Sequence, residues 1–200
     1  MKKLILLLLA ALAAFYMFGR EKTQIKNLGN PGETVVAFGD SLTYGHGAAR
    51  EQSYPALLAR KIARPVVNLG LNGDTAAAAP RRLPDVLAQD PYMVLIEFGG
   101  NDFMRGVPLE QSVSAVGEMV DAVQAAGAVA AVVDTGGYYG MKKYTKAYKK
   151  LARDKGAVFV PGILDGVFGQ RSLMSDQIHP NAKGYEMVAD KVYKEIKNYL

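Results

Sequence analysis

The sequence contains no cysteine and only two histidines. Without cysteine the chain cannot form a disulfide bond, a thiolate metal site, a cysteine nucleophile or a lipid-modified cysteine. The histidines, His46 and His179, are distant in the sequence and no acidic cluster accompanies them, so they do not predict a set of metal ligands. We therefore expect a protein without a metal or a cofactor, whose chemistry depends on other side chains.

A strong excess of one charge is also absent. The formal net charge is +5, but Lys2, Lys3 and Arg20 lie in the first twenty residues, which contain no acid. Beyond them, 21 basic residues stand against 19 acidic ones. The densest basic stretch, residues 142–150, is predicted to be the solvated face of a helix. This near balance predicts no nucleic-acid partner, and nothing in the sequence implies an obligate protein partner.

One long apolar run lies near the N-terminus, at residues 4–18, after two lysines and before a polar segment. This order is typical of an export signal. The run of fifteen residues is shorter than the roughly 20 that a membrane-spanning helix usually needs. It is therefore either removed after export or kept as a short membrane anchor. We expect a periplasmic or secreted protein with a signal or anchor at 1–20, a linker at 21–33 and one domain at 34–200.

Short apolar runs alternate with longer amphipathic ones after residue 33. Strands are predicted at residues 34–38, 65–68, 93–98, 128–133 and 157–160. Helices are predicted at residues 54–63, 79–89, 109–126, 142–155 and 181–199. Because the strands are apolar throughout, both of their faces are expected to be covered. The pattern predicts an α/β fold in which a five-stranded parallel sheet lies between layers of helices.

Glycine-rich turns follow the first four predicted strands, at residues 39–41, 70–74, 99–102 and 136–140. In an open parallel sheet, ligands bind beyond the carboxyl ends of the strands. Glycine at such turns lets backbone N–H groups approach a ligand without a Cβ in the way. The functional residues are therefore expected at this edge of the sheet.

Ser41 follows the first predicted strand and is a candidate nucleophile. A serine nucleophile needs a base within hydrogen-bonding reach, and that base needs an acceptor on its other nitrogen. His179 is the predicted base and Asp176, three residues earlier, the predicted acceptor. His46 lies only five residues from Ser41, so we expect it to act in the loop or at the mouth of the site and not in proton transfer.

Three groups could stabilise the negative charge that develops on an ester carbonyl under attack. They are the N–H of Ser41 at a helix start, the N–H of Gly73 and the side-chain amide of Asn101. Each has an ordinary structural explanation when taken alone, as a helix cap or a turn residue. Their occurrence after successive strands of one sheet favours an oxyanion hole.

Four blocks of the sequence together resemble the SGNH hydrolases, also called GDSL-type esterases. The blocks are Gly-Asp-Ser-Leu at 39–42, Gly73, Gly-Asn-Asp at 100–102, and Asp176 with His179. The resemblance covers residues 34 to about 190 and is greatest to bacterial periplasmic acyl thioesterases, lysophospholipases and arylesterases. It implies a three-layer, flavodoxin-like α/β/α fold, a triad of Ser41, Asp176 and His179, and an oxyanion hole of Ser41, Gly73 and Asn101. Residues 134–138 depart from these relatives, which leaves the acyl-chain preference open.

The main hypothesis is a cofactor-independent hydrolase of carboxylic esters or thioesters, acting on a small-molecule or lipid substrate through an acyl-enzyme. An O-acetylesterase of polysaccharide or peptidoglycan would use the same triad and remains an alternative. Phe103, Met104, Tyr138, Tyr139 and Met141 would line an apolar groove in the first case, or would only cover the edge of the sheet. A non-catalytic, phosphate-binding module is the alternative of another class, but no phosphate-binding glycine motif stands at a strand-to-helix turn.

Overall fold

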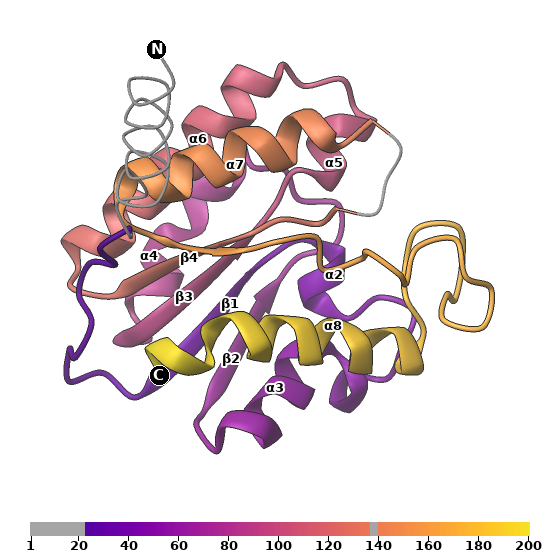
Figure 1. The fold of residues 1–200 in the computed structure, drawn as a ribbon, viewed down its shortest axis with the longest axis horizontal. Helices are drawn as coiled ribbons and strands as arrows, with labels where there is room; N and C mark the ends of the chain where they lie inside the picture. Colours follow the sequence, from indigo (N-terminus) through magenta and orange to yellow (C-terminus); the bar gives the residue numbers. More distant parts are fainter. Residues whose placement is uncertain (1–22, 137–139) are drawn as a thin grey trace, which may run out of the picture.

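The computed structural model describes residues 23–136 and 140–200. Its centre is a parallel sheet of five strands in the order β2-β1-β3-β4-β5 (Figure 1). The strands are β1 (Thr34–Gly39), β2 (Val66–Gly70), β3 (Pro91–Glu97), β4 (Val129–Val133) and β5 (Val158–Val160). This order is that of the flavodoxin-like folds. The predicted α/β fold with five parallel strands is confirmed.

Both faces of the sheet are buried, as the apolar strands predicted. Side chains alternate between the faces along a strand. On β1, Val36 and Phe38 belong to one cluster of core residues, whereas Val35 and Ala37 belong to the cluster on the other face. All four are fully buried. Continuous apolar strands are the consequence of this two-sided burial.

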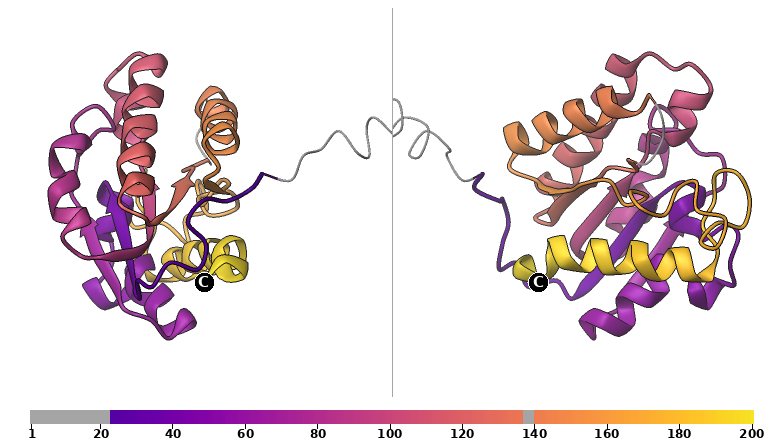
Figure 2. Two further views of the ribbon diagram at one scale, coloured as in Figure 1. Left: turned by 90° about the vertical axis from the view of Figure 1, so that its left-hand side faces the viewer. Right: turned by 45° about the vertical axis from the view of Figure 1, so that its right-hand side comes forward.

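Helices cover each face of the sheet. α4 (Leu83–Leu87), α6 (Leu109–Ala125) and α7 (Lys142–Lys155) pack on one face, and α3 (Tyr54–Ile62) and α8 (Ala182–Ile196) pack on the other. Figure 1 shows α6 and α7 on one side of the strands and α3 and α8 on the opposite side, and Figure 2 gives two further views of these layers. α7 buries Tyr144, Tyr148 and Ala152 at a spacing of four residues. The five lysines between residues 142 and 150 are exposed, as expected for a solvated basic face.

Three local features differ from the sequence prediction. The short helix α5 (Gly100–Met104) stands where a glycine-rich turn was predicted, and α2 (Ser41–Tyr44) begins at the helix start expected at Ser41 but was not among the predicted helices. Helices of this length are too short to show the apolar periodicity of a helix. The single helix predicted at 79–89 is instead a 3-10 turn, η2 (Ala79–Arg82), followed by α4. Pro84 near the start of α4 has no N–H to continue the preceding turn. Two further 3-10 turns are η1 (Arg50–Gln52) and η3 (Lys197–Tyr199).

The first described residues are bound to the edge of the sheet where the strands begin. Lys26 N–H donates to the carbonyl oxygen of Gly156 at 3.0 Å, and the Asn27 amide donates to that of Ala128 at 3.0 Å. Residue 128 directly precedes β4, and residue 156 lies two positions before the start of β5. The predicted signal or anchor at residues 1–20 lies outside the described residues. Among those described, no helix combines the length and the apolar character that crossing a bilayer requires.

The opposite edge, where the strands end, collects the loops of interest. β1 lies in the sheet between β2 and β3, so the chain leaves β1 in one direction for β2 and crosses back to β3 on the other side. Such a reversal opens a crevice beyond the carboxyl ends of the two strands at which it occurs. α2 begins directly after β1 and α5 directly after β3. The fold therefore places Ser41 and Asn101 at the same crevice.

Candidate active site

Ser41 is the first residue of α2, two residues after β1 ends. Asp40 caps the helix, because its Oδ1 accepts the N–H of Leu42 at 2.9 Å. A side chain at Gly39 would collide with Thr43 Oγ1 and would come within 2.6 Å of the Glu97 carbonyl oxygen. Only glycine lets the chain turn this tightly from strand to helix. The turn holds Ser41 at the carboxyl edge of the sheet, with its N–H at a helix start.

Asp176 and His179 meet in a compact turn before α8. Asp176 Oδ1 accepts the backbone N–H groups of Ile178 and His179, each at 2.8 Å, and its Oδ2 lies 2.8 Å from His179 Nδ1. Burial raises the pKa of Asp176, but the hydrogen bonds from the His179 ring and the two N–H groups outweigh it and lower the pKa to about 2. The carboxylate is therefore ionised at neutral pH and accepts a hydrogen bond from Nδ1–H.

His179 in turn contacts Ser41. Its Nε2 lies 3.0 Å from Ser41 Oγ, although the two residues are 138 positions apart in the chain. Because Nδ1 carries the proton donated to Asp176, Nε2 of the neutral ring has a free lone pair that accepts from the serine hydroxyl. The structure brings the three residues of the predicted triad into one hydrogen-bonded series.

Asn101 lies in α5 and is largely buried. Its Nδ2 donates to Asp40 Oδ2 at 2.9 Å. An amide nitrogen carries two protons, so a second proton can meet an oxyanion while the first holds the side chain in place. Asp40 therefore links the start of α2 to the start of α5, since it binds both Leu42 and Asn101.

Gly73 lies in the turn after β2 and has a φ of +75°. Arg105 stabilises this turn, because its Nη2 donates to the Gly73 carbonyl oxygen at 2.8 Å. Asp102 ties the same loop to α5, since its Oδ2 accepts the N–H of Ala76 at 2.8 Å and its Oδ1 accepts the Ser112 hydroxyl at 2.9 Å. The loops that carry Gly73 and Asn101 are thus cross-linked to each other.

A buried pair of carboxyl groups, Asp40 and Glu97, supports the site and was not predicted. Asp40 is 2% exposed and Glu97 is 0% exposed. Glu97 Oε2 accepts the hydroxyl of Thr43 at 2.9 Å, and Thr43 contacts the hydroxyl of Tyr54 at 3.1 Å. One signal was present in the sequence, because Glu97 is an acid at the end of an otherwise apolar strand.

The charges of the two buried carboxyl groups interact, so ionising both would be costly and one of them keeps a proton. Burial raises the pKa of Asp40 to about 6, against the lowering effect of the hydrogen bonds from Leu42 and Asn101. Burial and the nearby charge of Asp40 raise the pKa of Glu97 well above its usual range. Glu97 is therefore the protonated partner at neutral pH, and Asp40 keeps the charge that accepts from Asn101.

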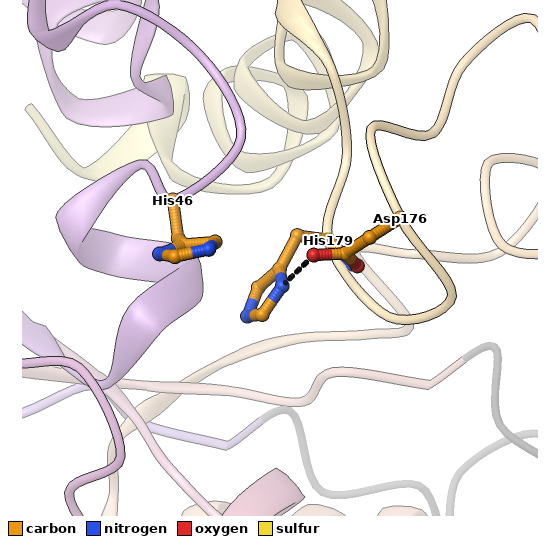
Figure 3. A group of neighbouring side chains, drawn as sticks. All are labelled: His46, Asp176 and His179. Carbon is orange, nitrogen blue, oxygen red and sulfur yellow. Dashed lines mark hydrogen bonds and ion pairs between the residues drawn. The ribbon is translucent and has the colours of Figure 1, made fainter.

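His46 lies beside His179, although the two residues are distant in the sequence. The two rings are 4.3 Å apart between centroids and are tilted by 45° (Figure 3). The loop of His46 packs closely against the turn that carries His179. A side chain at Gly47 would collide with Ser175 Oγ and come within 2.7 Å of the Pro180 carbonyl oxygen. Distance in the sequence was therefore a wrong ground for excluding the two histidines as joint ligands, because folding brings their loops together at one edge of the sheet.

The residues predicted to bind substrate are only partly described. Phe103 and Met104 follow Asn101 in α5 and are 40% and 50% exposed, whereas Met141 is buried. Tyr138 and Tyr139 lie outside the described residues. Two large side chains that we did not predict, Tyr44 and Leu71, are also exposed. Tyr44 belongs to the helix of Ser41, and Leu71 lies two residues before Gly73.

Comparisons with known proteins agree with this arrangement. The profile of the GDSL-like lipase/acylhydrolase family matches residues 37–187. The chain is 31% identical to "Esterase TesA" of Pseudomonas aeruginosa over 180 residues, which are 84% of this chain and 90% of that protein. It is 32% identical to "Thioesterase 1/protease 1/lysophospholipase L1" of Escherichia coli K12 over 175 residues, which are 82% of this chain and 84% of that protein.

A comparison with solved structures also finds a TesA structure. The crystal structure of TesA superposes with a TM-score of 0.78 at 31% sequence identity and covers 84% of this chain and 99% of that one. The similarity in sequence therefore extends over nearly the whole described domain and is accompanied by the same three-dimensional arrangement.

Proposed function

The chain belongs to the GDSL-like lipase/acylhydrolase family, and we propose that it hydrolyses carboxylic esters through an acyl-enzyme formed on Ser41. The contact of 3.0 Å between His179 Nε2 and Ser41 Oγ supports this most directly. Asp176 is the residue that orients His179, since its carboxylate accepts from Nδ1 at 2.8 Å. The family relationship makes the protein a serine hydrolase of esters, and the roles of these residues are our assignment.

The reaction follows from the order of the contacts. Ser41 Oγ attacks the ester carbonyl carbon while His179 Nε2 takes the hydroxyl proton. Asp176 stabilises the resulting imidazolium because its carboxylate stays ionised beside Nδ1. His179 then returns the proton to the leaving alcohol or thiol, and the acyl group remains on Ser41. A water molecule, activated by the same nitrogen, releases the acid and restores the serine.

We assign the oxyanion hole to the N–H groups of Ser41 and Gly73 and to the side-chain amide of Asn101. Such donors are most effective when they are held in place before the reaction begins. Asp40 fixes the amide of Asn101, and Arg105 fixes the turn of Gly73. The site therefore does not have to reorganise when charge develops on the carbonyl oxygen.

We propose an ester or thioester with an apolar acyl or aryl group as the substrate. The exposed apolar side chains Tyr44, Leu71, Phe103 and Met104 belong to the same three loops as the proposed oxyanion donors and offer contact to such a group. The names of the relatives, an esterase and a thioesterase/lysophospholipase, agree with this class. They do not favour the alternatives of an O-acetylesterase or a phosphate-binding module.

We propose that the protein is exported to the periplasm or secreted. Support comes from the two lysines followed by the apolar run at residues 4–18. If that run stays attached as an anchor, it joins the domain at the edge where the strands begin, because residues 26–27 are bound there. The active site would then lie on the far side of the sheet from the membrane.

A fluorophosphonate probe tests the nucleophile, since it reacts with an activated serine. Wild-type protein should be labelled, and Ser41→Ala should not be. Hydrolysis rates of p-nitrophenyl esters from acetate to palmitate, measured beside acyl-CoA and lysophospholipid, test the substrate class. A rate that is highest for acetate and falls steeply with chain length would contradict the apolar acyl site.

A further inference from the structure

His46 has no part in the proposed reaction, yet its ring packs against the ring of His179 (Figure 3). One ring nitrogen of each histidine and one carboxylate oxygen of Asp176 lie within 4.8 Å of one another. His46 and Asp176 are exposed and His179 is half-buried, so an ion from solvent can reach all three. Two imidazoles and a carboxylate are a donor set that zinc and copper prefer.

We propose that His46 and His179, with Asp176, form an inhibitory site for a divalent transition-metal ion such as Zn²⁺ or Cu²⁺. Zinc bonds to nitrogen at about 2.0–2.1 Å, which places two tetrahedral ligand atoms roughly 3.3 Å apart. The donor atoms are within 4.8 Å, so a small rotation of the exposed His46 side chain closes the site. The inhibition rests on the proposed function, whereas the binding of the ion does not.

The backbone of His46 is held in a way that favours this site. Its N–H donates to the Ser41 carbonyl oxygen at 3.0 Å, and its own carbonyl oxygen accepts the Tyr185 hydroxyl at 2.8 Å. Gly45 and Gly47 on either side both have a positive φ, which turns the chain tightly around His46. The side chain therefore stays beside His179 while its ring is free to turn.

The ion would remove the proposed base whichever nitrogen of His179 it binds. Bound to Nε2, it occupies the lone pair that accepts the proton of Ser41. Bound to Nδ1, it displaces the hydrogen bond to Asp176 and leaves the ring proton on Nε2, which then cannot accept another. When the ion binds Nδ1, Asp176 is a ligand. When the ion binds Nε2, Asp176 orients the bound imidazole, as carboxylates commonly do for metal-bound histidine.

The test uses tag-free protein in a buffer without phosphate or thiols, with ZnCl₂ as the ligand. Esterase rates should fall as ZnCl₂ is added and return when EDTA is added. His46→Phe keeps a ring against His179 but has no nitrogen ligand, so its rate without metal should equal that of the wild type. The concentration of Zn²⁺ that halves its rate should be about 10- to 100-fold higher, since loss of a direct ligand should cost at least as much affinity as loss of a second-shell partner. MgCl₂, whose ion prefers oxygen ligands, should have no effect on either protein.

Calorimetry with ZnCl₂ separates this proposal from the proposed function. Wild-type and Ser41→Ala proteins should both bind Zn²⁺, and His46→Phe should bind it at least about tenfold more weakly. This result would support the site even if no ester were hydrolysed. Any of three results would overturn the proposal. Zn²⁺ could inhibit wild type and His46→Phe equally, it could bind to both equally, or it could bind to an active wild-type enzyme without inhibiting it.

Discussion

Replacement of Asn101 by alanine tests the proposed oxyanion hole and separates it from an ordinary turn. In the structure the Asn101 amide donates to the buried carboxylate of Asp40 at 2.9 Å. The substitution therefore removes two things at once, a proposed donor to the transition state and a hydrogen bond of the folded state. The two losses are measured by different experiments.

The expected magnitudes differ in kind. Loss of one oxyanion donor should lower kcat on the order of 10²- to 10³-fold, or about 3 to 4 kcal/mol, with little change in KM. Loss of a buried hydrogen bond to a charged group should lower the free energy of unfolding by about 1.5 to 3 kcal/mol. For a domain of this size, each kcal/mol corresponds to a fall in Tm of roughly 2 to 4 °C.

Asn30→Ala is the matched control. Like Asn101, Asn30 donates hydrogen bonds through its amide, in its case to the backbone oxygens of Asn27 at 3.0 Å and Tyr92 at 3.1 Å. Asn30 lies near the amino ends of the strands and so away from the proposed site. It should lower Tm as Asn101→Ala does and leave kcat unchanged. Both variants can be measured by thermal unfolding and by steady-state kinetics on a p-nitrophenyl ester at a temperature where they are folded.

The two roles give opposite results. If Asn101 only stabilises its turn, Asn101→Ala should show a lowered Tm with a wild-type kcat for the folded protein, as Asn30→Ala does. That result would remove Asn101 from the site and leave the N–H groups of Ser41 and Gly73 as the only assigned donors.

Five further single variants and one double variant test the remaining roles. Ser41→Ala and His179→Ala should each abolish nearly all hydrolysis while the protein stays folded, and the double variant should be scarcely slower because the residues act as a unit; losses that multiply would refute the triad. Asp176→Asn should lower kcat roughly 10⁴-fold. Folding lowers the pKa of Asp176 to about 2. The ionised Asp176 therefore stabilises the fold at any pH above its unfolded pKa, and this contribution is lost as pH falls towards 2. A difference in Tm between wild type and Asp176→Asn that stayed constant from pH 4 to pH 2 would contradict this. Folding raises the pKa of Glu97, so the wild type should lose stability relative to Glu97→Gln as pH rises from about 4.5 to 8; parallel Tm curves would argue against the buried proton. Gly73→Ala must adopt a φ of +75° and should lose about 1 to 2 kcal/mol of stability; an unchanged Tm would contradict the strain expected at this turn.

The strands and the longer helices were predictable because their signal is local. Each strand is a run of apolar residues between turns, and each long helix repeats its apolar residues with the period of one face. The short helix α5 was not predicted and α2 was predicted only as a helix start at Ser41, since four or five residues show no period. The helix predicted at 79–89 is divided near Pro84, whose missing N–H interrupts a continuous helix.

Ser41, Asp176 and His179 could be named from the sequence because histidine is rare in it and the four blocks occur in a known order. What the sequence could not provide was the distance between Ser41 and His179, which are 138 positions apart and meet at 3.0 Å. That distance depends on the order of the strands, which brings the end of β1 and the turn before α8 to the same edge.

The surroundings of the site were decided by tertiary structure alone. The sequence contains Glu97 and His46 but does not show what lies beside them. The charge of Asp40 acts on the buried Glu97 because β3 lies next to β1 in the sheet. His46 packs against His179 because the glycine at position 47 lets one loop lie directly on another. A raised pKa and a pair of histidines are properties of such neighbours in space, and a linear pattern of residues does not specify them.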